Sequence, residues 1–150
     1  MKNLFLFSIS PVQSFIAQAR KTQDLFAGSY ILSHLCRVAI EKARGEPYQA
    51  EIVFPDPSNE TLLNRFLAIV GENTKEYLAG MGWAVENAVR SEFQHMGDAI
   101  LDKMGLPKPP EFDEQIKTHW QIFWLFEEFE EGCFADAYKK AEQTFGALKN

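Results

Sequence analysis

The 150-residue sequence is poor in the residues that carry most metal and redox chemistry. It contains only two cysteines and three histidines. Cys36 and Cys133 stand far apart, with no Cys-x-x-Cys pair and no partner at metal-ligand spacing. We therefore interpret both as buried free thiols in a reducing compartment, and we assign no metal-binding residue.

Long apolar runs and an excess of positive charge are also missing. No stretch approaches the ~20 apolar residues that cross a bilayer, and the first ten residues lack the apolar length and cleavage site of a signal peptide. The formal net charge is −6, which argues against a free-standing nucleic-acid binder. We expect a soluble, cytoplasmic protein without membrane contact.

The sequence does contain a regular alternation of strand and helix patterns. Strands are predicted at Leu4–Ile9, Ala50–Phe54, Arg65–Val70 and His119–Phe126. Helices are predicted at Pro11–Ala19, Leu25–Arg44, Asn73–Met104, Glu111–Thr118 and Cys133–Leu148, with a bend at Arg20–Asp24. This order predicts an α+β, ferredoxin-like (split βαβ) domain over residues 1–150, with a four-stranded antiparallel sheet, helices on one face and a C-terminal helix.

The predicted strands are apolar on both sides. Leu4, Phe5, Leu6 and Phe7 are consecutive, so the sheet face opposite the two helical layers needs a cover as well. Another domain, a partner subunit or the last helix could supply that cover.

The turn after the first strand has the features of a helix start. Ser10 precedes Pro11, and Gln13 follows Ser10 by three residues, the spacing of a capped helix with proline at its first position. A helix N-terminus suits phosphate, and Arg20 and Lys21 follow about two turns later. The alternative is that this is only a well-capped strand–helix unit, because no glycine-rich phosphate loop is present.

The run from Ser8 to Leu35, SISPVQSFIAQARKTQDLFAGSYILSHL, closely resembles the opening of the first palm-like domain in the large subunit of type III-B CRISPR effector complexes, the Cmr complex. Asn64-Arg65-Phe66 resembles the family's Pro-Asn-Arg-Phe strand, with Leu63 in place of proline, and Trp120–Trp124 resembles its aromatic strand. Ala147–Asn150 resembles the point at which that palm ends. We therefore expect a fragment or an unusually short member.

The resemblance implies a function. In the family, two palm domains bind ATP with Mg²⁺ between them and make cyclic oligoadenylate for antiviral defence when the complex binds target RNA. By this resemblance the partners are a second palm domain and other subunits of a CRISPR ribonucleoprotein, with guide and target RNA indirectly. The nucleotide-binding residues implied are Ser10, Gln13, Ser14, Arg20, Lys21, Ser29 and Tyr30.

The sequence departs from the family in its catalytic motifs. It has no His-Asp dipeptide, no Gly-Gly-Asp-Asp hairpin and no acid at the end of the first strand, where Ser8 and Ser10 stand instead. Metal ions in palm enzymes are held by carboxylates. We assign no catalytic residue and expect this chain not to catalyse nucleotidyl transfer alone.

Two other functions stay open. The first is a non-catalytic assembly module of an RNA-guided complex, in which aromatic residues such as Phe5 or Trp124 would face a partner from the open side of the sheet. The second is an RNA-binding ferredoxin-like domain, which would need exposed stacking aromatics and a basic surround. The acidic balance argues against the second.

Overall fold

A computed structural model describes the backbone of residues 1–11, 22–60 and 62–149, and the side chains of these residues except 11 and 22–29. The strands are β1 (Lys2–Pro11), β2 (Glu51–Phe54), β3 (Arg65–Gly71) and β4 (Trp120–Phe129). The helices are α2 (Thr22–Arg44), α3 (Lys75–Met104), α4 (Phe112–Thr118) and α5 (Phe134–Lys149).

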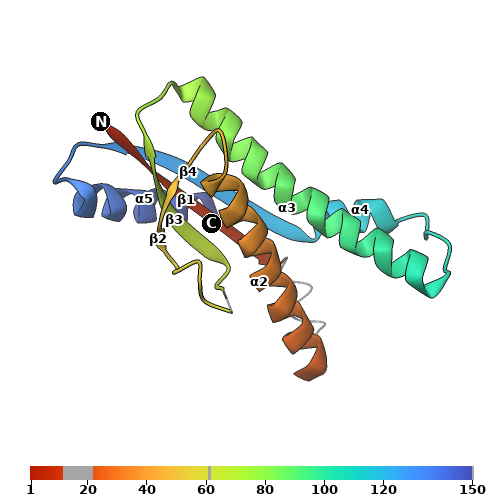
Figure 1. Cartoon of the computed structure of the whole chain (residues 1–150). Coiled ribbons are helices and arrows are strands. Elements are labelled where there is room, and N and C mark those ends of the chain that lie inside the picture. The colour runs from red at the N-terminus through yellow and green to blue at the C-terminus, as the bar shows by residue number, and fades with distance from the viewer. Residues whose placement is uncertain (12–21, 61, 150) are drawn as a thin grey trace.

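The four strands form one antiparallel sheet in the order β2-β3-β1-β4. β1 is therefore central, and it pairs with β3 and with β4 along almost its whole length (Figure 1). This strand order, with one helical connection between β1 and β2 and another between β3 and β4, is that of the ferredoxin-like split βαβ fold. The predicted α+β class and antiparallel sheet are confirmed.

One face of the sheet is covered by α2 and α3, as predicted. Phe5, Phe7 and Ile9 of β1 point to this side, where they join a core with residues of both helices. Phe5 is fully buried, stacked on Phe126 at 4.4 Å between ring centroids. The idea that Phe5 or Trp124 faces a partner from an open side is therefore wrong, because alternation along β1 and β4 turns both side chains toward the helices.

The opposite face of the sheet is covered by α5. Leu4 and Leu6 of β1 join a second core with Leu67 of β3 and with the apolar stripe of α5, which comprises Ala137, Ala141 and Phe145. Figure 1 shows α5 running across the sheet on the side away from α2 and α3. The sequence analysis named another domain, a partner subunit or the last helix as the cover of this face. The structure shows that the last helix covers it.

The long third helix is confirmed in spite of its glycines. The Thr74 hydroxyl accepts a hydrogen bond from the Tyr77 amide at 3.1 Å, which caps the start of α3. Gly105 ends the helix in the left-handed conformation, with φ of 66°, a geometry that glycine adopts without strain. The predictions for α2, α4, α5, β2 and β3 also agree with the structure to within three residues at each end.

The prediction of a helix that starts at Pro11 is wrong. Ser10 and Pro11 belong to β1, where Ser10 is paired with Gln121 and Pro11 with Trp120. The residue before a proline is biased toward extended backbone, and β4 is long enough to pair with that extension. Residues 12–19 of the predicted helix lie outside the described residues.

Two smaller expectations also need correction. The bend predicted at Arg20–Asp24 is wrong from Thr22 on, since α2 begins there. The thiol of Cys36 is buried, and burial raises its pKa to about 12, but Cys133 is exposed just before α5. No helix within the described ranges is long and apolar enough to span a membrane.

Gly82 lets α3 approach the sheet closely. A Cβ atom at this position would lie 2.3 Å from Cζ3 of Trp124 on β4. Trp124 is fixed from a second direction, because its indole N–H donates to Glu86 Oε1 of α3 at 2.9 Å. The indole therefore has little room to move away.

We predict that Gly82→Ala destabilises the protein by about 1–3 kcal/mol, the cost of overpacking a filled interior. The matched control is Gly80→Ala in the same helix, where an added Cβ meets nothing within 4 Å. That change should stabilise by up to about 1 kcal/mol through helix propensity. Denaturant unfolding of both variants measures the difference, and equal effects would contradict the close-packing argument.

Candidate functional site

The face of β1 that points to α5 changes from apolar to polar along the strand. Leu4 and Leu6 are buried in the core with α5, and the next residues on the same face are Ser8 and Ser10. The polar residues stand at the C-terminal end of β1, the edge at which the sequence analysis predicted a nucleotide site.

Neighbouring strands add polar residues to this end. Arg65 of β3 stands directly opposite Ser8, and Gln121 of β4 stands opposite Ser10. Directly opposed residues in an antiparallel pair have Cβ atoms about 5 Å apart and project to the same face. We call Ser8, Ser10, Arg65 and Gln121 the polar end of the sheet.

Arg65 is held in place by α5. Its guanidinium forms an ion pair and hydrogen bond with the Glu142 carboxylate, and its Cζ lies 5.8 Å from the centre of the Phe145 ring. About a third of each side chain in the ion pair is exposed, 30% for Arg65 and 33% for Glu142. The arginine is therefore oriented but still open to solvent, as an anion-binding arginine must be.

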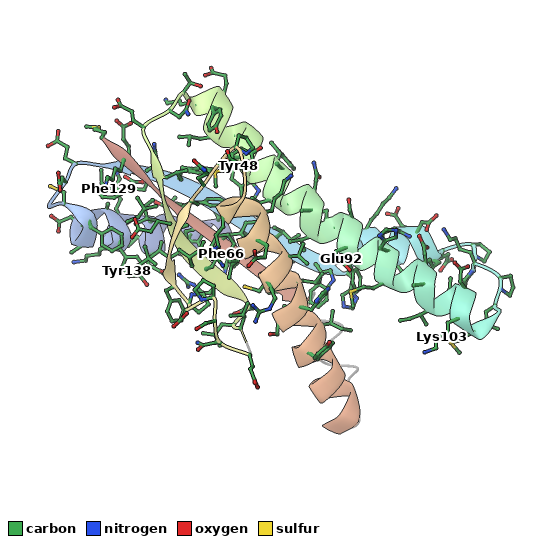
Figure 2. The ribbon with its side chains drawn as sticks, viewed as in Figure 1. Tyr48, Phe66, Glu92, Lys103, Phe129 and Tyr138 are labelled. Carbon is green, nitrogen blue, oxygen red and sulfur yellow. The ribbon has the colours of Figure 1, made fainter. Side chains whose placement is uncertain are left out.

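Two further ionisable side chains of α5 lie near Arg65. Lys149 Nζ lies 4.7 Å from the centre of the Phe145 ring, and its pKa is lowered, first by burial and then by the Arg65 charge. Tyr138, labelled on α5 in Figure 2, has a raised pKa, caused first by burial and then by the Glu142 carboxylate. Two cations and one carboxylate thus gather beside the polar end.

The hydroxyl group of Ser8 is unusual for a buried polar group. The Ser8 side chain is fully buried, and its Oγ has no hydrogen-bond partner among the described residues. A buried hydroxyl without a partner costs about 1–3 kcal/mol. Such a group is typical of a site where a ligand or a rearrangement completes the hydrogen bonding.

The structure places only part of the predicted nucleotide site. Ser10 lies in the polar end, whereas Tyr30 is on α2 with 68% of its surface exposed. Ser29 is also in α2, but its side chain is not described. The other predicted site residues, Gln13, Ser14, Arg20 and Lys21, lie outside the described residues.

Several residues of the polar end and its surroundings were absent from the predicted site, among them Ser8, Arg65 and Glu142. The sequence position of Ser8 could have indicated it, because it precedes Ser10 by two residues in a strand and so shares its face. The position of Arg65 indicated it more weakly, as a polar residue at the start of the apolar strand β3. No local pattern indicated Glu142, since it is 77 residues from Arg65 in the sequence.

Two other features carry less chemistry. Within the described ranges, no group of three or more His, Cys, Asp or Glu side chains could hold a metal ion. A shallow depression between α3 and α4 is lined in part by Arg90 and Lys117. Arg90 donates to Glu86 at 2.9 Å and to the Lys117 carbonyl at 3.1 Å, and no described residue of the predicted nucleotide site lines this depression.

Ser8→Ala is predicted to stabilise the isolated chain by about 1 kcal/mol, because it removes a buried hydroxyl that lacks a partner. Ser33→Ala is the control with the opposite sign. The Ser33 hydroxyl is also buried, but it accepts from the Leu62 amide at 2.8 Å, so its loss should destabilise by about 1–2 kcal/mol. Thermal unfolding distinguishes them, and a destabilised Ser8→Ala would mean that the hydroxyl is already satisfied.

Comparison with protein families gives an informative match. The family model described as "CRISPR-associated protein Cmr2, N-terminal" matches residues 4–124, which include most of β1, all of β2 and β3, and the first half of β4. Among curated proteins, none matches the sequence. One solved structure, an amidase of the hydantoinase/carbamoylase family from Burkholderia multivorans, is 14% identical with a TM-score of 0.24. The alignment covers 95% of this chain and 32% of the amidase, and a likeness this low carries no argument.

Proposed function

The chain belongs to the family of the N-terminal part of Cmr2, the large subunit of type III-B CRISPR complexes, and we propose that it contributes a nucleotide-binding half-site to that subunit. The ligand is ATP with Mg²⁺, and the parent protein uses it to make cyclic oligoadenylate. The chain acts as the first palm-like domain, at the interface with a second palm. The observation that carries this proposal is the polar end of the sheet in a chain of this family.

The chemistry of the polar end suits a polyphosphate. Arginine presents a planar fork of N–H donors that matches phosphate oxygens, and Arg65 projects from the sheet within reach of solvent. Ser10 is half-buried beside it, and the Ser8 hydroxyl has no partner among the described residues. Ser8 is fully buried beneath this surface, so Arg65 and Ser10 are the groups of the polar end that a phosphate can reach.

The polar end lacks the carboxylates that a complete nucleotidyl-transfer site needs. ATP carries its Mg²⁺ on the phosphates, and carboxylates must hold that ion during in-line attack. β1 ends in Ser8 and Ser10, without an acid. In this proposal the second palm supplies the metal carboxylates, and this chain supplies cations and hydroxyls. Gln13, Ser14, Arg20, Lys21, Ser29 and Tyr30 extend the same half-site.

Assembly without nucleotide contact is the second candidate, and the exposed edge of the sheet at β4 favours it. The RNA-binding alternative is disfavoured by α5, which lies on the sheet face where bases would stack.

We predict that Ser10→Ala and Arg65→Lys each weaken ATP–Mg²⁺ binding by the assembled complex about tenfold, the loss that follows removal of one charge-assisted or hydroxyl hydrogen bond. Arg65→Lys keeps the positive charge but removes the planar fork of guanidinium N–H donors. Ser91→Ala on the exposed side of α3 is the control. Calorimetry measures the affinities of the wild-type and variant complexes, and it also compares this chain alone with a longer protein in which the chain is joined to the second palm.

Binding only by the longer protein is the expected result for a half-site completed elsewhere. Wild-type affinity in both site variants, with the longer protein binding ATP, would remove the polar end from the nucleotide site. Absence of binding in every form would leave assembly as the function.

A further inference from the structure

The β4 edge of the sheet is long and regular. β4 pairs with β1 over ten consecutive residues, from Trp120 opposite Pro11 to Phe129 opposite Lys2, without a bulge. Its other side pairs with no strand within the described ranges. A ten-residue strand with one unpaired side presents a continuous row of backbone N–H and C=O groups.

These outward backbone groups have no partner in the described part of the chain. Hydrogen bonds outside helices and strands join turns and caps, and none of them involves β4. The Trp124–Glu86 hydrogen bond uses the indole N–H and not the backbone of β4. Water can satisfy these groups, and so can an added strand.

The side chains of the edge strand β4 are less buried than those of the central strand β1. Phe5, Leu6 and Phe7 of β1 are fully buried. Their direct neighbours on β4, which are Phe126, Leu125 and Trp124, are only partly buried. Helices therefore cover both faces of β4, and no element of the described part of the chain covers the edge between them.

The first seven residues of β4 lack the features that usually protect an edge strand. Residues 120–126 contain no charge, proline or glycine, whereas exposed edges are commonly interrupted by one of these. The opposite edge of the same sheet is protected. β2 has only four residues, its register shifts between Ile52 and Phe54, and Pro55 follows directly.

The charge at the end of β4 indicates the kind of partner. Glu128, Glu130 and Glu131 are exposed, and Glu127 is already paired with Lys140 at 3.1 Å. A strand laid along β4 would therefore meet apolar side chains first and then three free carboxylates. A second copy of this chain carries a net charge of −6 and is repelled, whereas a basic segment is attracted.

We propose that β4 is a docking edge for an extended segment of another subunit of the complex, a segment that is apolar along its length and carries Lys or Arg at the end beside Glu128–Glu131. Backbone hydrogen bonds supply the affinity of such strand addition, and the side chains set the register. The two surfaces share β4 at Gln121, but docking uses backbone groups at the edge whereas the polar end uses side chains on the sheet face, so docking does not depend on ATP.

Backbone hydrogen exchange tests the proposal on the full protein, free and bound to the purified remaining subunits. Strand addition should slow exchange of the outward amides of β4 by at least about tenfold, because they become hydrogen-bonded. The amides of β2 are the internal control and should not change. Unchanged β4 exchange on assembly would overturn the proposal, and so would protection already present in a dimer of the free chain.

Charge reversal provides the second measurement. Glu128→Lys should weaken binding to the remaining subunits about tenfold at low salt, with a smaller effect as salt rises. Glu51→Lys is the matched control, because Glu51 is an exposed glutamate on the protected edge strand β2. Both variants should retain the wild-type melting temperature. Equal binding by the two variants would contradict a basic partner at β4.

Discussion

Burial of β1 on both faces is the constraint on which the rest of the structure depends. Four consecutive apolar side chains, Leu4 to Phe7, have no exposed surface, and each contributes about 1.5–3 kcal/mol when removed from water. A strand of this kind is stable only at the centre of a sheet with a layer on each side. Helices α2 and α3 form one layer and α5 forms the other, so α5 is part of the fold and not an appendage.

The same strand determines where polar chemistry can stand. The face toward α5 stays apolar as far as Leu6 and becomes polar at Ser8, so a ligand that approaches this face meets hydroxyls only at one end. α5 reaches that end with Glu142, which orients Arg65 from a distance of 77 residues in sequence. One helix therefore closes the core and also positions a cation beside the site.

Local patterns predicted most of the fold, and failed where distant residues decide the outcome. Helical periodicity over Asn73–Met104 identified α3, although only the structure shows that Gly82 admits the Trp124 ring. The Ser10-Pro11 turn was misread as a helix start, because the length of β4, more than 100 residues later, decides how far β1 continues. The same limit applies to the polar end: the sequence indicated Ser10, which is local to its motif, but not the Arg65–Glu142 contact, which joins distant residues.

The strand order also explains why the sheet offers an edge rather than a face for docking. Because α5 occupies the face opposite α2 and α3, a partner strand can reach the backbone only from β2 or β4. β2 is short, shifted in register and followed by proline, and β4 is long and unbroken. Because β1 is central, the long aromatic strand β4 stands at the edge of the sheet, where a partner strand can reach it. Nucleotide contact at the polar end and strand addition at β4 can then occur together, since one uses side chains on the sheet face and the other uses backbone groups at its margin.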